Sequence, residues 1–157
     1  MSRILSTPDD RVLAGIRIAL GLVMLPHGLQ KTLGVFGGYG FAGTMHFFTG
    51  TMGIPALFAF LAIVAESAGA LGLVTGTLGR VAALGILANM TVAALTTHVQ
   101  HGFFMNWYGN QAGEGFEYHL LASALALAVV IRGSGAWSVD RVLAAHPWRS
   151  VARLARA

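Results

Sequence analysis

The sequence predicts an all-α integral membrane protein: a four-helix bundle with a short interfacial or re-entrant helix between the first two spans. Of its 157 residues, 55% are hydrophobic and only 10% are charged, whereas a soluble domain has about 25% charged residues. Its mean hydropathy is +0.69. Several apolar stretches approach the roughly 20 residues that a helix needs to cross a bilayer. This length and composition predict one transmembrane domain over residues 1–157.

The first predicted span covers residues 8–33. Its start is marked by Thr-Pro-Asp-Asp at residues 7–10, because threonine caps helices, proline suits the first helical position, and aspartates favour the positive end of the helix dipole. Pro26 predicts a kink beside His27, since proline removes a backbone hydrogen bond. We expect this span to be retained as a signal anchor, because acidic residues stand where a leader peptide would be apolar.

One stripe of this first span is ionisable. Arg17, His27 and Lys31 fall within an arc of roughly 80° on an ideal helix. A membrane span tolerates such groups only where they face protein or water. We therefore expect partners for them on the other helices.

A glycine-rich connection, residues 34–55, follows the first span. Large apolar residues recur in it at helical spacing: Phe41, Met45, Phe48 and Met52. This spacing predicts the short interfacial or re-entrant helix. His46 lies near its centre and is interpreted as an interface residue rather than a ligand.

Three further spans are predicted, at about residues 55–75, 80–99 and 116–132. Glu66 lies near the middle of the second span and Asn89 near the middle of the third. Small residues recur every four positions at Ala68, Gly72 and Gly76. They form a ridge that a neighbouring helix, or a second copy in a homodimer, could approach closely. The remaining residues, 138–157, are predicted to form an amphipathic segment that Ser138 caps.

Basic residues gather at one predicted membrane face. They are Arg3, Arg11, Arg80, Arg132, Arg141, Arg149, Arg153 and Arg156. Lys31 alone lies toward the other face, so the positive-inside rule predicts a multi-pass protein of a bacterial-type inner (plasma) membrane with both termini cytoplasmic. The same placement argues against a nucleic-acid partner despite the net charge of +4. The chain has no cysteine, which excludes a disulfide or thiol relay within it.

The deepest charges are predicted to pair with one another. An unpaired charge in the bilayer costs several kcal/mol, so we expect Arg17 to bind Glu66, with Asn89 completing the arrangement. Two interpretations stay open: an ion pair that sets the helix register, or a proton or ligand site.

A second polar cluster is predicted at the outward end. Two pairs share helix faces: His27 with Lys31, and His98 with His101. Glu117 and His119 point to nearly opposite sides of the fourth span. We expect Glu117 to face the cavity, because an intramembrane carboxylate has fewer acceptable alternatives.

This outward cluster predicts binding of a quinone or another small polar-headed molecule. His27 and Glu117 would exchange protons as the catalytic groups. The expected substrate-binding residues are Lys31, Arg17, Glu66, Asn89 and His98. There are three alternatives: a bis-histidine haem, a water-filled structural pocket, and a metal ion bound by His27, His98, His101 and Glu117. Lys31 would repel such a cation.

Several motifs together resemble the DoxX family. They are His27-Gly28 followed by Lys31, Glu66 in an alanine- and glycine-rich span, Gly115-Phe116-Glu117 opening the last span, and the ending Gly-Ser-Gly-Ala-Trp-Ser-Val-Asp at 133–140. The resemblance covers about residues 11–140. It marks His27, Lys31, Glu66 and Glu117 as family-like polar positions, and Arg17 matches an arginine early in the first span. His46 and the pair His98/His101 stand outside the family pattern.

Membership would imply a four-helix inner-membrane protein associated with redox chemistry. Some relatives are described as subunits of thiosulfate:quinone oxidoreductase and others as partners of oxidative-stress enzymes. We therefore expect a redox-associated subunit that works with a soluble or membrane oxidoreductase, whether or not the chain is itself catalytic. A proton-coupled transporter subunit gated by Arg17 and Glu66, or a non-catalytic scaffold for a soluble oxidoreductase, are the alternatives.

Overall fold

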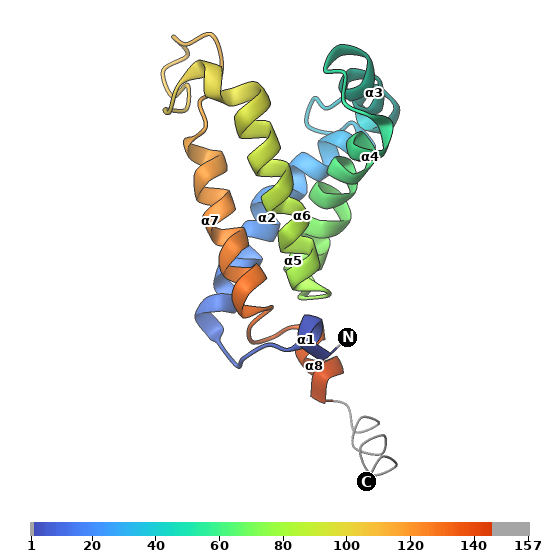
Figure 1. Ribbon diagram of the computed structural model, residues 1–157, viewed down its shortest axis with the longest axis vertical. Helices are drawn as coiled ribbons and strands as arrows, with labels where there is room; N and C mark the ends of the chain where they lie inside the picture. Colours follow the sequence, from blue (N-terminus) through green and yellow to red (C-terminus); the bar gives the residue numbers. More distant parts are fainter. Residues whose placement is uncertain (1, 146–157) are drawn as a thin grey trace.

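The computed structural model describes residues 2–145, which contain helices and turns but no strand. Four long helices form the bundle (Figure 1). They are α2 (Arg11–Leu33); α4 (Ala56–Val64), η2 (Ala65–Gly69) and α5 (Ala70–Thr75) in sequence; α6 (Gly79–Ala93), η3 (Ala94–His98) and η4 (Val99–His101) in sequence; and α7 (Glu117–Arg132). The short helices are α1 (Ser2–Leu5), α3 (Gly40–His46), η1 (Phe47–Thr51) and α8 (Val139–Ala145).

The predicted all-α membrane bundle is confirmed. Within the described residues, three helices have the length and hydropathy of a membrane span: Arg11–Leu33, Ala56–Thr75 and Gly79–His101. The fourth, α7, has 16 residues, about 24 Å at 1.5 Å per residue, and packs along α6 (Figure 1). The short helix expected between the first two spans is present as α3 and η1.

The bundle has two ends of different character (Figure 1). We call the end with α3, η1 and the connection 102–116 the loop end. We call the opposite end, with α1, α8 and the turns 76–78 and 133–138, the terminal end. The predicted amphipathic segment 138–157 is helical over Val139–Ala145, and its remainder lies outside the described residues. Ser138 Oγ accepts from Arg141 N at 3.3 Å, as expected of a helix cap.

The first long helix begins later than predicted. Its N-cap is Asp10, whose side chain accepts a hydrogen bond from Leu13 N, so α2 starts at Arg11 rather than Pro8. Thr7 is used elsewhere: its hydroxyl accepts from Gly135 N at 2.5 Å. Aspartate caps helices at least as well as threonine, and the tertiary contact at Thr7 decides between them.

Small residues allow the helices to cross closely. A Cβ on Gly21 would lie 2.9 Å from Val74 N. The ridge predicted to be free for a second copy is used inside the chain: a Cβ on Gly76 would lie 2.4 Å from Ser138 Cβ, and one on Gly72 2.9 Å from Thr77 O. The prediction of an exposed Gly72/Gly76 ridge is therefore wrong, because Ser138 packs onto Gly76 and Thr77 and Ala82 pack onto Gly72.

Large apolar side chains fill the core of the bundle and also lie on its outer surface. Buried ones from four helices form the core: Leu20, Met24, Leu73, Ile86 and Val129. Others on the outer faces are exposed: Leu57, Phe58, Leu84, Leu120 and Ile131. A continuous apolar exterior of this kind is what a lipid environment requires.

Candidate functional site

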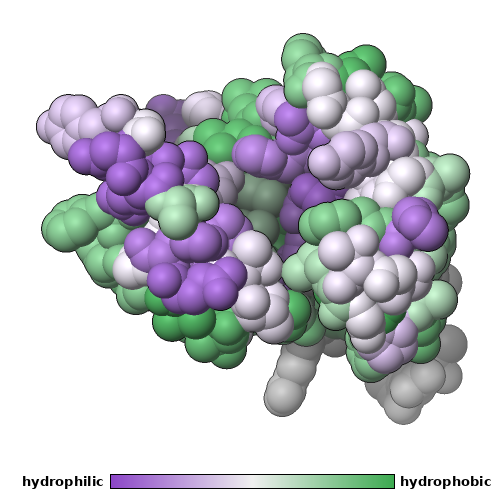
Figure 2. All heavy atoms as spheres, turned by 90° about the horizontal axis from the view of Figure 1, so that it is seen from above, coloured by the Kyte–Doolittle hydropathy of each residue, from purple (hydrophilic) through white to green (hydrophobic). Residues whose placement is uncertain are grey.

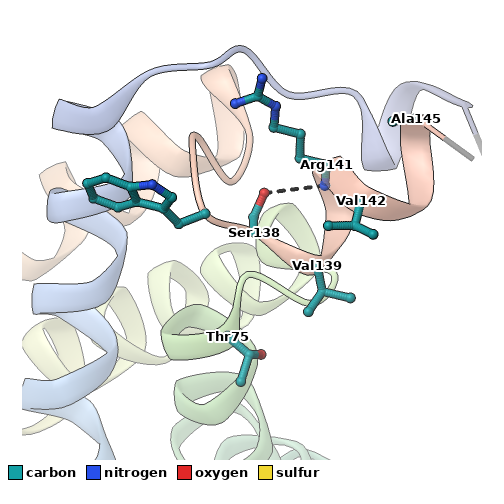
Figure 3. A pocket seen from close by; sticks show the side chains of 7 residues that line it. Thr75, Ser138, Val139, Arg141, Val142 and Ala145 are labelled. Atoms are coloured by element: carbon teal, nitrogen blue, oxygen red, sulfur yellow. Dashed lines mark hydrogen bonds between the residues drawn. The ribbon is translucent and has the colours of Figure 1, made fainter.

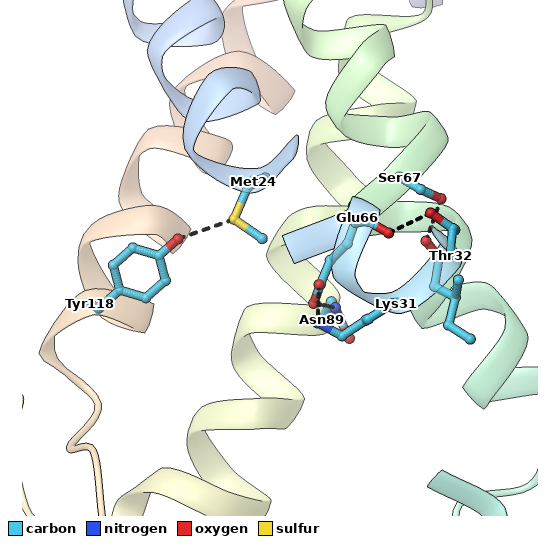
Figure 4. Close-up of polar contacts among 9 residues, drawn as sticks. Met24, Lys31, Thr32, Glu66, Ser67, Asn89 and Tyr118 are labelled. Atoms are coloured by element: carbon cyan, nitrogen blue, oxygen red, sulfur yellow. Dashed lines mark hydrogen bonds and ion pairs between the residues drawn. The ribbon is translucent and has the colours of Figure 1, made fainter. Parts of the chain in front are cut away.

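Glu66 is the centre of a polar cluster that joins three helices (Figure 4). The residue is only 5% exposed. One carboxylate oxygen forms an ion pair with Lys31 Nζ from α2, and the other accepts from Asn89 Nδ2 of α6 at 2.5 Å. Both oxygens of this buried charge thus have donors, which is the condition for keeping a charge inside a membrane protein. We call Lys31, Glu66 and Asn89 the Glu66 cluster.

Local backbone features bring these three side chains together. Glu66 lies in η2, a π-helical turn, and such turns occur frequently at functional sites. On the facing helix, a Cβ on Gly28 would lie 2.2 Å from Glu66 O, so only glycine allows α2 to approach this turn. Lys31 follows Gly28 by three residues and therefore stands on the same face of α2. The close approach at Gly28 and the three-residue spacing to Lys31 together bring the lysine to Glu66.

The predicted ion pair between Arg17 and Glu66 is wrong. Arg17 is fully buried at the terminal end. Its guanidinium donates to backbone carbonyls only: Ser134 O at 2.7 Å, Val74 O at 2.9 Å, Trp137 O at 3.3 Å, Ala136 O at 3.5 Å, and Leu73 O. The last carbonyls of a helix have no intrahelical donor, and a guanidinium offers five N–H groups to satisfy them.

The terminal end also contains a buried negative charge, the carboxylate of Asp140. It is 1% exposed and accepts from Leu78 N at 2.7 Å, Gly79 N at 2.9 Å and Ser134 Oγ at 2.6 Å. It therefore caps the start of α6, while Arg17 caps the end of α5. Sequence reasoning missed this role of Asp140, although the Ser-x-Asp ending of the last motif was its signal. We call Arg17, Ser134 and Asp140 the terminal clasp.

Glu117 organises the loop end rather than the interior. Its Oε1 accepts from Met105 N at 3.1 Å and from Trp107 Nε1 at 2.9 Å, so it holds the connection 102–116 above α7. Of the two residues, His119 is buried and Glu117 is half-buried, so His119 rather than Glu117 points into the packed interior. The carboxylate finds N–H donors in the adjacent connection and needs no interior partner.

The histidines lie in two separate contacts near the loop end. His119 is 7% exposed, and its ring stacks on that of His98 with 4.0 Å between centroids. His98 Nδ1 lies 2.8 Å from Glu114 O. His27 is exposed and faces the ring of Tyr118 at 6.3 Å between centroids. The Tyr118 hydroxyl donates to Met24 Sδ at 3.3 Å, which turns it toward α2 (Figure 4).

The alternative metal ligands do not converge. Among the described residues, no three His, Asp or Glu side chains are placed to hold one ion. His27 faces a tyrosine ring and Glu117 is bound to loop N–H groups. The sequence spacing of His98 and His101 therefore does not bring the four predicted ligands to one point.

The loop end is hollowed between two raised parts. Figure 2 looks onto this end and shows hydrophilic residues along the rim and wall of the hollow, with hydrophobic residues toward the periphery. Lys31 lies two residues before the end of α2 on this side, and its side chain is 22% exposed. Its side chain is therefore partly open to the surroundings of the bundle at this end.

Replacing His119 with phenylalanine is expected to leave the melting temperature in detergent unchanged or raised. His119 Nδ1 is buried and has no hydrogen-bond partner among the described residues, and an unsatisfied buried polar atom costs about 1–3 kcal/mol. A phenyl ring keeps the stacking on His98 without that cost. His46→Phe, at an exposed position, is the control, and a clear fall specific to His119→Phe would mean that Nδ1 has a bound partner.

Comparison with known proteins gives one match. The sequence model of the DoxX family matches residues 12–99, a stretch that contains Arg17, His27 and the whole Glu66 cluster. Glu117 and the ending at 133–140 lie beyond it. No curated protein and no solved structure matches the chain. Because the matched residues make up more than half of the sequence and carry its central polar cluster, the chain belongs to the DoxX family.

Proposed function

We propose that this DoxX protein is a redox-associated subunit of the inner membrane that binds a quinone headgroup or a small sulfur- or oxygen-containing substrate at the loop end. The observation that carries the proposal is the Glu66 cluster: a buried carboxylate with a donor on each oxygen, bound to the only lysine of the sequence in the last turn of α2 at the loop end. Quinone is our first choice of ligand, because its carbonyl oxygens accept hydrogen bonds while its apolar tail can remain in lipid.

The side chains at the loop end have different chemical roles in this proposal. The Lys31 ammonium has three N–H donors; one binds Glu66, and another is free to donate to a carbonyl oxygen and to stabilise negative charge on it. His27 is exposed next to Tyr118 and is the proton-exchanging group. Glu117, first expected to share that task, supports the connection above the site. The chain has no cysteine to relay electrons, so a redox role would use a bound cofactor, the quinone or a partner oxidoreductase.

The proposal includes an orientation. Arg11, Arg80, Arg132 and Arg141 belong to the terminal end, and Lys31 belongs to the loop end. The positive-inside rule then places the terminal end in the cytoplasm and the hollow on the outer side.

The two alternatives have less support. A transporter gated by Arg17 and Glu66 requires these side chains to meet. Instead, Arg17 binds backbone carbonyls at the terminal end, and Glu66 binds Lys31 near the other end of α2. A scaffold for a soluble oxidoreductase would use the basic tail 146–157, which lies outside the described residues. No described contact favours a second function.

The test is quinone retention and binding. We expect the wild-type protein, purified in mild detergent, to bind a short-chain ubiquinone analogue in equilibrium dialysis. His27→Phe and the double variant Lys31→Met/Glu66→Gln should each lose about tenfold or more in affinity, because each removes at least one hydrogen bond to the headgroup. The double variant removes both charges together, so it leaves no unpaired buried ion to unfold the protein.

His46→Phe at the same end of the molecule is the matched control and should bind like wild type. Equal binding by wild type and both site variants would refute the proposed site. Binding of a small sulfur-containing anion in place of the quinone analogue, lost in the same variants, would keep the site and change its ligand.

A further inference from the structure

A separate cavity lies at the terminal end, between the end of α5 and α8 (Figure 3). It is open to the surface along much of its length, and its volume is about 640 Å³. Apolar side chains line most of it, from Trp137, Val139, Val142 and Ala145, and Arg141 lies at its edge. The hollow of the proposed function is at the other end of the bundle, so this cavity is independent of it.

Trp137 is placed in a way that the fold alone does not explain. Its backbone is left-handed, with φ of 50°, a strained conformation for a bulky residue. Its carbonyl accepts from Arg17 at 3.3 Å, but its side chain is 71% exposed and gains little from burial. Indole rings favour the membrane–water interface. The exposed indole of Trp137 therefore suits a membrane–water interface.

Arg141 supplies the charge at this depth. Its guanidinium forms an ion pair with Asp9, and the two side chains are 42% and 63% exposed. An exposed ion pair contributes little to stability, so a phosphate can compete with Asp9 for the guanidinium. Arg132 stands at the same end with a similar partner, Asp10, at 3.8 Å. The cation at the edge of the cavity, Arg141, is therefore bound only by a weak ion pair with Asp9.

We infer that this cavity binds one anionic phospholipid. The phosphate lies on Arg141 in place of Asp9, and an acyl chain runs along Trp137, Val139 and Val142. Guanidinium groups bind phosphate in a two-pronged geometry, and an acyl chain matches the apolar lining. The chain's own tail, residues 146–157, is the competing occupant, but it carries Arg149, Arg153 and Arg156, whose charge has the same sign as that of Arg141.

Native mass spectrometry in mild detergent tests the inference, with phosphatidylglycerol and phosphatidylcholine as probes. We expect wild type to retain phosphatidylglycerol in preference to phosphatidylcholine. Arg141→Gln should lower phosphatidylglycerol binding about fivefold, since one basic residue contributes about 1 kcal/mol to binding an anionic headgroup. Asp9→Asn should raise it, because the internal competitor is removed. A purely structural ion pair would instead make both variants behave alike.

Two further variants decide the remaining outcomes. Arg132→Gln removes a cation at the same end but outside the cavity lining, and it should leave binding unchanged. An equal loss in Arg132→Gln and Arg141→Gln would mean diffuse charge attraction and would overturn the site. Replacing all three tail arginines with glutamine in the full chain should also leave binding unchanged; loss of lipid there would assign the headgroup to the tail and refute the inference.

Discussion

Arg17→Met is expected to destabilise the protein by more than about 3 kcal/mol, since each buried carbonyl left without a donor costs about 1–3 kcal/mol, and to abolish most of its yield from membranes. Arg17 is fully buried and donates to five backbone carbonyls, on α5 and on the turn 133–138. Methionine fills part of the volume but donates to none of them. Because water cannot replace these donors inside the bundle, each orphaned carbonyl adds to the cost.

Fluorescence-detected gel filtration and thermal unfolding in detergent measure this effect. Arg11→Met is the matched control, because Arg11 is exposed on the same helix and should cost little. Arg17→Lys separates charge from geometry: lysine keeps the charge but not the planar fork, so we expect it to remain strongly destabilised. Full rescue by lysine would show that charge, and not carbonyl capping, is what the position requires.

The second large effect is expected at the Glu66 cluster. Glu66→Gln alone leaves Lys31 without its anion, and Lys31→Met alone leaves Glu66 without its cation. Breaking a buried pair by removing one partner costs about 3–5 kcal/mol. The double variant should be less destabilised than the sum of the two, because neither charge is then left alone. Thermal unfolding in detergent of the wild type, the two single variants and the double variant gives the coupling free energy between Lys31 and Glu66.

The cluster also offers a chemical readout. Lys31 is the only lysine in the sequence, so an amine-reactive reagent can modify only it and the chain's amino terminus. We expect Glu66→Gln to speed modification of Lys31, because the amine is then no longer held by the ion pair and can turn outward to meet the reagent. Additive stabilities together with an unchanged modification rate would show that the two side chains are not coupled in the membrane protein.

Local sequence patterns predicted much of the fold. The apolar stretches gave α2, the helix Ala56–Thr75 and the helix Gly79–His101 close to their observed bounds, because hydropathy and helical period are properties of neighbouring residues. The spacing of Phe41, Met45, Phe48 and Met52 gave the short helix of α3 and η1. The start of α2 was misjudged, since two capping residues compete there and a distant contact at Gly135 decides which one is used.

The candidate site was predicted less well, for a physical reason. Residue numbers gave the approximate depth of each ionisable group, but Arg17 and Lys31 were both long enough to reach Glu66. Backbone carbonyls, which every residue carries and no sequence pattern marks, proved to be the partners of Arg17. Glu117 and His119 were likewise separated by where the connection 102–116 places its N–H donors.

The sequence by itself determined that this chain is a helical membrane protein of the DoxX family with ionisable groups that need internal partners. Tertiary structure alone decided who those partners are. The contact of Gly28 with the π-helical turn at Glu66 sets the crossing of two helices, and that crossing brings Lys31 rather than Arg17 to the carboxylate. Hydropathy is carried by each residue, whereas a buried ion pair depends on distances of a few ångströms between helices.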